Sequence, residues 1–239
     1  MESLPYFILL ALFAEIMGTV GGFGSSMFFV PIAGFFFDFH SVLGITALFH
    51  LSSNVSKITL FKKGFDKKLI LTIGIPAVIF VIAGAFLSRF FDTRLLSRLL
   101  SVFLIVISLL LLLFKNFSIK PTLFNSVTGG ALSGITAGLL GTGGAIRGLT
   151  LSAFDLKTEV FIVTSAMIDL GIDFSRSIVY FSNGYMHKDD LYLIPILLVV
   201  SITGTFIGKK LLAFFSAAQF KTIVLLLILV TGVITLVKK

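Results

Sequence analysis

A glycine-interrupted apolar segment occurs twice in this sequence and constrains the fold more than any other feature. The first copy, Gly18 to Pro31, reads GTVGGFGSSMFFVP, and the second, Gly138 to Leu151, reads GLLGTGGAIRGLTL. Three glycines of one copy align with three of the other at one constant offset of 120 residues. A repeated break inside membrane-length apolar sequence predicts interrupted helices whose free backbone groups can hold a substrate, as in transporters.

The composition predicts an all-α integral membrane protein. Of 239 residues, 57% are hydrophobic and only 13% are charged, whereas a soluble domain carries roughly 25% charged residues. Apolar stretches close to the spanning length of about 20 residues recur along the whole chain. We therefore expect a multi-pass protein of the cell membrane, with the lipid bilayer as its solvent.

The net charge of +8 does not indicate a nucleic-acid partner. The basic residues fall in short clusters between apolar segments, such as Lys67-Lys68 and Lys209-Lys210, where they anchor and orient helices. No basic run is long enough for a nucleic-acid-binding arm. The chain has no cysteine, which excludes disulfides and thiolate metal sites. We expect no metal and no cofactor.

Eight apolar segments divide into two sets of four, which we interpret as two membrane repeats, residues 1–117 and 118–239. The linker between them is Lys115–Pro121, and the start, MESLPYFILLALFAEIMG, is interpreted as a first membrane segment rather than a removable signal peptide. The segments are expected at about 4–37, 41–61, 69–90 and 96–114, and at about 121–152, 158–182, 189–214 and 219–237.

The first segment of each repeat is too long for one simple span. About 33 residues would make a helix of roughly 50 Å, against a hydrocarbon core of about 30 Å. The segment is therefore either a tilted, overlong helix or two shorter helices folded back as a re-entrant hairpin. Folding back gives inverted repeats and spanning gives parallel repeats. Loop charges favour inverted repeats, because that arrangement gives the larger imbalance of Lys and Arg between the two sides.

The second segment of each repeat carries three polar residues at the spacing i, i+4, i+7, which places them on one helical face. The first set is His50, Asn54 and Lys57, and the second is Asp169, Asp173 and Arg176. Ionisable residues inside membrane segments are costly and usually functional. The alternative for the two cations is that they lie near helix ends and extend to the membrane interface.

Arg147 follows the second glycine break by three residues. A helix N-terminus already favours anions, and a guanidinium adds paired hydrogen bonds to a sulfonate, sulfite or carboxylate. An arginine that extends to lipid headgroups is the alternative. The residues expected to bind substrate are Gly21, Gly22, Gly24, Ser25, Ser26, Asn54, Lys57, Gly141, Thr142, Gly143, Gly144, Arg147 and Arg176.

Four titratable residues are candidates for coupling transport to protons. Each set of three forms a polar stripe along its helix. In the second stripe the negative charge of Asp169 has no partner within the stripe, because Asp173 can pair with Arg176 three residues on. His50 is as consistent with a satisfied core histidine as with a titrating one. Glu15, just before the first break, is either a coupling acid or a neutralised packing residue. The coupling set is therefore His50, Asp169, Asp173 and Glu15.

The paired breaks resemble the TauE/SafE sulfite exporter family. GGFGSSMFFVP and GTGGAIRGLTL stand at its two signature positions, and the resemblance covers nearly the whole chain. Two departures occur: Ser25-Ser26 replace a common third glycine, and Gly148 and Leu151 stand near a usual proline. The resemblance implies transport of small sulfur-containing or carboxylate anions; the residues alone indicate a small anion.

These observations predict a secondary transporter for a small anion rather than an enzyme, since no nucleophile–base arrangement is visible. The alternatives are a passive channel for the same anions and a non-transporting membrane partner or receptor subunit. Substrate identity, transport direction, coupling ion and whether the chain forms a homo-oligomer stay open at this stage.

Overall fold

The computed structural model contains helices joined by loops, and no strands, in the residues that it describes, which are 4–22, 24–62, 64–114, 119–187, 190–212, 214 and 217–238. Residues 1–3 at the start of the chain and residues 115–118 of the predicted linker lie outside this set. The helices are α1 (Leu4–Gly21), α2 (Ser26–Ala33), α3 (Phe39–Phe61), α4 (Lys67–Leu69), the π-helix η1 (Ile70–Gly74), α5 (Ile75–Ser88), α6 (Thr93–Leu113), α7 (Leu123–Leu140), α8 (Gly144–Ser152), α9 (Thr158–Ser182), α10 (Leu193–Leu211) and α11 (Ala217–Lys238).

The chain folds back at both glycine breaks. Phe7, near the start of α1, packs its ring against Phe36 and Phe37 just after α2, with centroids 5.3 and 5.2 Å away. Likewise, Gly129 near the start of α7 lies against Thr150 near the end of α8. A tilted, overlong helix over residues 4–37 is therefore excluded, because α1 and α2 form a hairpin. The same geometry holds for α7 and α8.

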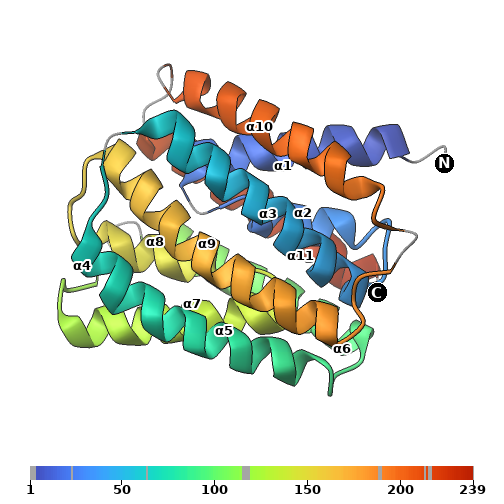
Figure 1. Ribbon diagram of the computed structural model, residues 1–239. Coiled ribbons are helices and arrows are strands. Elements are labelled where there is room, and N and C mark those ends of the chain that lie inside the picture. The colour runs from blue at the N-terminus through green and yellow to red at the C-terminus, as the bar shows by residue number, and fades with distance from the viewer. Residues whose placement is uncertain are drawn as a thin grey trace.

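The two central helices, α3 and α9, run in opposite directions. The ring of His40 at the start of α3 stacks on Tyr185 beyond the end of α9, with centroids 4.2 Å apart. At the other end, the backbone N–H of Asp66, past α3, donates to Oγ1 of Thr164 early in α9, at 2.9 Å. Figure 1 shows α3 and α9 side by side in the middle of the bundle, with both chain termini at one end.

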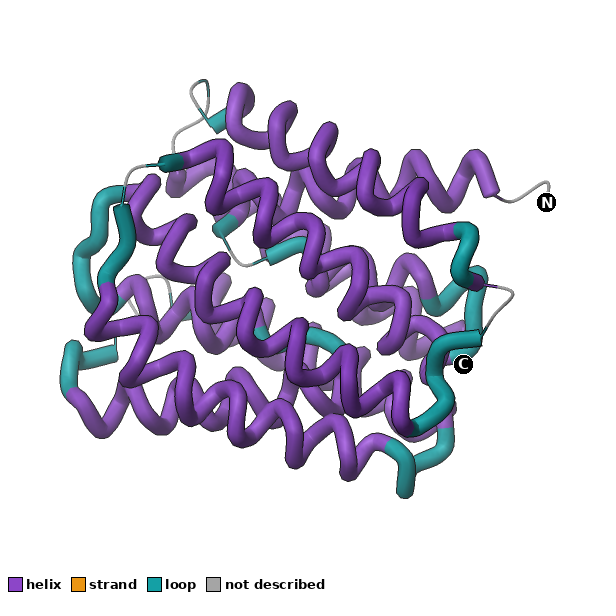
Figure 2. Tube along the Cα trace, in the orientation of Figure 1, coloured by secondary structure: helices purple, strands orange, loops and turns teal. Residues whose placement is uncertain are grey.

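The remaining helices pair across the chain rather than with their neighbours in sequence. Helix α5 packs on α7, α1 on α10, and α6 on α11. Every one of these pairs joins residues before the linker to residues after it. Figure 2 shows the resulting helical bundle and the two loops that interrupt the helices inside it. The two halves are thus interlocked, and each buries its apolar helix faces against the other.

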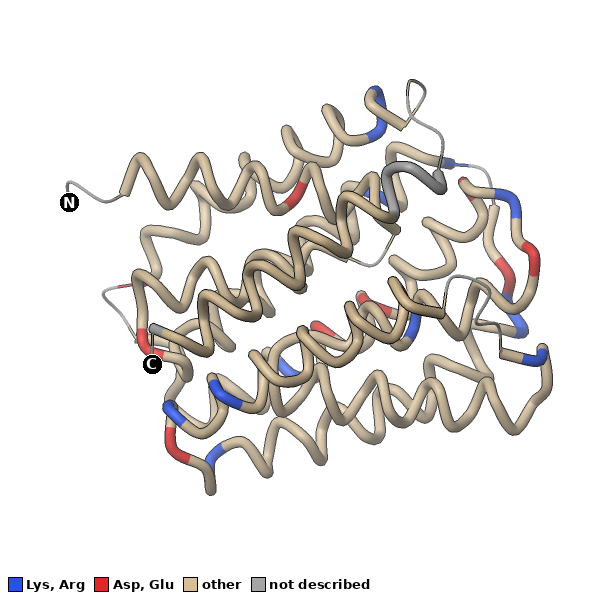
Figure 3. The backbone as a smooth tube through the Cα atoms, turned by 180° about the vertical axis from the view of Figure 1, so that it is seen from behind, with Lys and Arg blue, Asp and Glu red and all other residues tan. Residues whose placement is uncertain are grey.

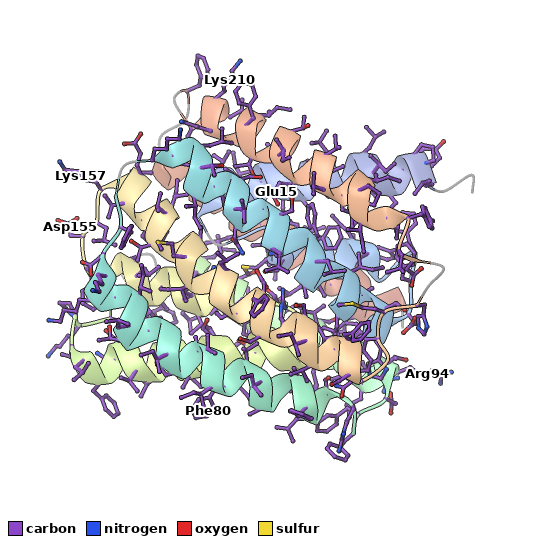
Figure 4. All side chains as sticks on the ribbon, in the orientation of Figure 1. Glu15, Phe80, Arg94, Asp155, Lys157 and Lys210 are labelled. Atoms are coloured by element: carbon purple, nitrogen blue, oxygen red, sulfur yellow. The ribbon has the colours of Figure 1, made fainter. Side chains whose placement is uncertain are left out.

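The outer surface is apolar and the charges gather at two ends or inside. Leu9, Ile79 and Val199 are 60% or more exposed, which suits contact with lipid chains. In Figure 4, Phe80 points outwards, Glu15 lies among the helices, and Arg94 lies at the opposite end from Lys157. Five described helices have the length and hydropathy to cross a membrane: Leu4–Gly21, Lys67–Ser88, Thr93–Leu113, Leu123–Leu140 and Leu193–Leu211. The protein is thus an all-α, multi-pass membrane protein.

A stripe of small residues holds α5 and α7 in close contact. Gly130, Gly134 and Gly138 recur every four residues on α7, and a Cβ at each would collide with a backbone carbonyl oxygen of η1 or α5. Small residues at this spacing let the backbones of two helices approach closely. In lipid there is no hydrophobic driving force between helices, so this close van der Waals contact is a main source of their association.

Substitution Gly134→Ala tests this packing. At an exposed position, replacing glycine with alanine stabilises a helix by about 1 kcal/mol. At position 134, however, the added Cβ would collide with the backbone of Ala77. We expect a net loss of about 1–3 kcal/mol of stability, as for overpacked cores, measured as a lower midpoint of thermal unfolding in detergent. The control is Gly74→Ala, whose Cβ meets nothing closer than a side-chain carbon of Ile168 at 3.6 Å. An unchanged midpoint for Gly134→Ala would contradict the close contact.

Candidate functional site

The two glycine breaks meet near the centre of the bundle. Gly22, Gly24 and Gly141 have φ of 72°, 83° and 78°, a left-handed conformation that glycine adopts without strain. These residues end α1 and α7 and turn the chain into α2 and α8. Oγ of Ser26 lies 3.0 Å from Oγ1 of Thr142, so one hydrogen bond joins the first break to the second.

The two predicted polar stripes face each other between α3 and α9. Nδ2 of Asn54 donates to Oδ2 of Asp173 at 2.7 Å, and both side chains are buried. The spacing i, i+4, i+7 on each helix therefore does place its polar residues on the shared interface. Among the described residues, this contact between α3 and α9 and the breaks beside it form a polar seam that contains the buried charged side chains.

Each of the three buried cations in this seam has a carboxylate partner. Nζ of Lys57 lies 3.1 Å from Oε1 of Glu15, and Nη2 of Arg176 lies 2.7 Å from Oδ1 of Asp173. Arg147 pairs with Asp169. The cations are only 2–7% exposed, so the alternative that they extend to the membrane interface is wrong. Burying a charge in this way requires a partner and further hydrogen bonds, and the three pairs supply both.

Arg176 holds the end of α7 rather than an open site. Its Nη1 donates to the carbonyl oxygens of Ala137 at 3.0 Å and Gly141 at 2.8 Å. The hydroxyl of Tyr180 donates to the carbonyl of Gly138 at 2.7 Å. These carbonyls belong to the last turn of a helix, which leaves acceptors without intrahelical partners. Tyr180 was not among the predicted site residues. Its position one helical turn after Arg176 was the sequence feature that could have indicated it.

Arg147 stands at the first turn of α8 and reaches across to α9. Its Nε donates to Oγ of Ser165 at 2.9 Å, and its Nη1 contacts Asp169. Nη2 lies 3.6 Å from the point that a Cβ on Gly24 would occupy. A larger residue at Gly24 would therefore crowd the guanidinium, so the first break and the second jointly define the space around Arg147.

A cavity with an empty volume of about 290 Å³ lies beside this guanidinium. Its charged lining consists of Lys57, Arg147 and Asp169. The lining is Gly18, Thr19, Gly22, Gly24, Asn54, Lys57, Arg147, Ile162, Ser165, Ala166 and Asp169. We call this cavity the central pocket. It contains two cations, one carboxylate and one carboxamide within a wall of glycines and small residues.

Several residues predicted to bind substrate lie elsewhere. Gly21 lines the neighbouring vestibule described below. Arg176 is not part of the pocket wall and lies in the contact between α7 and α9, paired with the predicted coupling acid Asp173. The following residues shape the breaks without lining the central pocket: Ser25, Ser26, Gly141, Thr142, Gly143 and Gly144.

A wider vestibule of about 1010 Å³ adjoins the central pocket and lies towards one end of the bundle. The two cavities share Thr19, Gly22 and Ile162 in their walls. The outer part of the vestibule is lined by residues at helix ends, including Leu111, Asp155, Leu156, Thr158 and Leu212. This end is opposite to that of the chain termini (Figure 1).

Glu15 is fully buried and accepts from an unusual number of hydroxyls. The hydroxyls of Ser25 and Ser53 donate to it at 2.6 Å each. Thr205 on α10 donates at 3.0 Å and Thr19 at 3.2 Å, in addition to the Lys57 ammonium. Glu15 thus connects α1, α2, α3 and α10. Ser53 and Thr205 were not among the predicted site residues. The sequence offered a signal only for Ser53, which lies four residues before Lys57 and so on the same helical face.

Comparison with known proteins identifies the family. The family model described as sulfite exporter TauE/SafE matches residues 7–235, which include both breaks, both stripes and every helix that lines the pocket. A search of curated proteins gives no match. The match extends over almost the entire chain and coincides with a multi-pass helical bundle. The chain belongs to the TauE/SafE sulfite exporter family of membrane transport proteins.

Proposed function

We propose that this protein is a secondary transporter of small anions, with sulfite, organosulfonates and related sulfur-containing anions as the substrate class. The observation that carries the proposal is the central pocket, where Lys57 and Arg147 line a buried cavity between two helix breaks. Family membership supports the sulfur oxyanion class. The pocket supports a small substrate, because it is a narrow space whose wall consists largely of glycines and other small residues.

The proposed architecture is a pair of inverted repeats, residues 1–117 and 118–239, each with a re-entrant hairpin and three spanning segments. Supporting it, equivalent helices run in opposite directions, as α3 and α9 do. The pairing of α1 with α10 has its counterpart in the pairing of α7 with α5. Each hairpin returns to the end at which it began, so each half crosses the membrane an odd number of times. Alternating access would rock these repeats against each other.

The vestibule is proposed to open to the cytoplasm. Cytoplasmic loops carry an excess of Lys and Arg. The described basic residues at the vestibule end are Lys62, Lys67, Lys68, Lys120, Lys157, Lys209 and Lys210, against Arg89, Arg94 and Arg98 at the other end. Figure 3 shows these two groups at opposite ends, seen from behind. The structure then corresponds to a state that is open inwards.

The charge balance of the site implies that an anion is accompanied by a proton. The carboxylate of Asp169 is paired with the guanidinium of Arg147, and a substrate oxyanion would need to bind to the same guanidinium. Two like charges about 4 Å apart repel by on the order of 4 kcal/mol at an effective dielectric constant of about 20. Protonation of Asp169 removes this repulsion and releases the guanidinium to bind the anion with paired hydrogen bonds. Asp169 is therefore the proposed coupling acid in the pocket.

Binding of a panel of sulfite, thiosulfate, sulfoacetate, taurine, methanesulfonate and simple carboxylates to the purified protein tests the substrate class. Counterflow in proteoliposomes then separates a carrier from a passive channel, because only a carrier is stimulated by substrate on the opposite side. A receptor or partner subunit would bind without flux. Binding of no anion in the panel would refute the proposed function.

Arg147→Lys is expected to weaken anion binding by about tenfold, because lysine keeps the charge but cannot form the paired hydrogen bonds of a guanidinium. The measurement is the dissociation constant of sulfite in detergent. Arg98→Lys, at an exposed position near one membrane end, is the matched control and should match wild type. Equal affinity in both variants would exclude Arg147 from the anion site.

Asp169→Asn is expected to bind the anion more tightly than wild type at neutral pH and to lose most of the pH dependence. In wild type, affinity should rise as the pH falls, because the proton neutralises the carboxylate that competes for Arg147. Methanesulfonate is the appropriate probe, since a sulfonate stays ionised between about pH 5 and pH 8 while carboxylates and histidines titrate. A variant that keeps the wild-type pH profile would show that another group takes up the proton.

A further inference from the structure

A continuous chain of hydrogen bonds leads from His50 to the central pocket. Nε2 of His50 lies 3.3 Å from Oγ of Ser25, and that hydroxyl donates to Oε2 of Glu15 at 2.6 Å. The other carboxylate oxygen, Oε1, lies 3.1 Å from Nζ of Lys57, which lines the pocket. Because Ser25 donates its proton to Glu15, Nε2 of His50 is the donor to Ser25. Every link therefore points its hydrogen towards Glu15.

The chain is buried along its whole length. His50 is 4% exposed, Ser25 and Glu15 are fully buried, and Lys57 is 7% exposed. His50 precedes Lys57 by seven residues on α3, which separates them by about 10 Å along the helix axis. The chain thus starts about 10 Å deeper than the pocket, towards the end of the bundle where the termini lie. That end is opposite to the vestibule.

The equivalent positions in the other half are apolar. At the repeat offset, Ile135 corresponds to Glu15, and Ala145 corresponds to Ser25. In the next segment the offset is 119, as for His50 and Asp169, and there Ile172 corresponds to Ser53. Ala85 corresponds to Thr205 at the offset of 120. The second break forms its hairpin without any of these polar groups, so the geometry of a break does not require them. Their presence in one half only points to a chemical role rather than a packing role.

We infer that His50, Ser25, Glu15 and Lys57 form a proton relay that supplies the central pocket by a route separate from the vestibule. The inference rests on the proposed function. His50 gives its Nε2 proton to Ser25 as Ser25 gives its hydroxyl proton to Glu15, and the neutral imidazole takes up a proton at Nδ1 from the side on which the chain termini lie. Lys57 gives a proton to Asp169 through the pocket that both line, and regains one from Glu15. One proton is taken up at Nδ1 of His50 and one O–H bond is formed at Asp169, while Ser25, Glu15 and Lys57 return to their starting state.

The charged groups around the relay come from three helices. Lys57 lies on α3 itself, Arg147 on α8 and Arg176 on α9, and all three cations repel a positive charge on His50, so the imidazole passes protons from its neutral form. Helix α10 contributes the hydroxyl of Thr205 to Glu15, and the start of α2 contributes that of Ser25. The aromatic rings of Phe29 and Phe49 flank His50. Asp169 is the acid that completes the relay at the pocket.

Ser25→Ala breaks the relay and leaves the rest of the network in place. Glu15 keeps Lys57 and the hydroxyls of Thr19, Ser53 and Thr205 as donors. Alanine already occupies the equivalent position in the second half, at Ala145. Thr205→Val is the matched control, because it removes one hydroxyl bond to the same carboxylate but lies off the route. Ser25→Thr restores the hydroxyl.

The experiment uses proteoliposomes with a trapped pH indicator and methanesulfonate as the probe anion. Methanesulfonate exchange at equal pH on both sides reports anion binding and movement, and proton flux driven by a methanesulfonate gradient reports coupling. We expect Ser25→Ala to exchange methanesulfonate within about twofold of wild type but to lose at least tenfold in coupled proton flux. Thr205→Val and Ser25→Thr should keep both activities.

Two results would overturn the relay. One is coupled proton flux in Ser25→Ala equal to that of wild type. The other is an equal loss in Ser25→Ala and Thr205→Val, which would make the hydroxyls around Glu15 purely structural. Absence of methanesulfonate binding and exchange by wild type is a different outcome, because it would refute the proposed function and the relay together.

Discussion

The balance of three buried cations against three buried carboxylates is the interaction on which the rest of the structure depends. Lys57, Arg147 and Arg176 lie in the middle of an apolar bundle, where an unpaired charge would cost several kcal/mol. Two of the pairs also tie together different helices. Lys57 joins α3 to α1 through Glu15, and Arg147 joins α8 to α9 through Asp169. The breaks are held where they are by these pairs.

The same balance determines what the site can do. Because Lys57 and Arg147 already have the carboxylate partners Glu15 and Asp169, substrate binding must change a protonation state or displace a carboxylate. Asp169 is the carboxylate at the pocket, and Glu15 is the one behind it. The two acids differ in their surroundings: Asp169 lines an open cavity, while Glu15 is enclosed by hydroxyls. This difference separates the proposed anion route from the inferred proton route.

Packing explains why only some helices carry this chemistry. Helices α5 and α7 contact each other backbone to backbone along a glycine stripe, which leaves no room for polar side chains between them. On the other side, Gly204 and Gly208 of α10 lie against the side chains of Glu15 and Thr19 on α1. The two related contacts thus use glycine for opposite purposes. One brings two backbones together, and the other makes space for a buried acid and its hydroxyl partner.

The sequence by itself determined the elements and their polar faces. Hydropathy located the helices, the glycines located both interruptions, and the i, i+4, i+7 spacing placed His50, Asn54 and Lys57 on one face, because these features depend only on local geometry. The same local geometry predicted the pairing of Asp173 with Arg176. Only the tertiary structure decided the partners of Lys57 and Arg147 and which residues reach the pocket. Glu15 and Lys57 are 42 positions apart in the chain, and Ser26 and Thr142 are 116 apart. Such contacts depend on how the hairpins fold back and how the halves interlock, and no local pattern in the sequence encodes that.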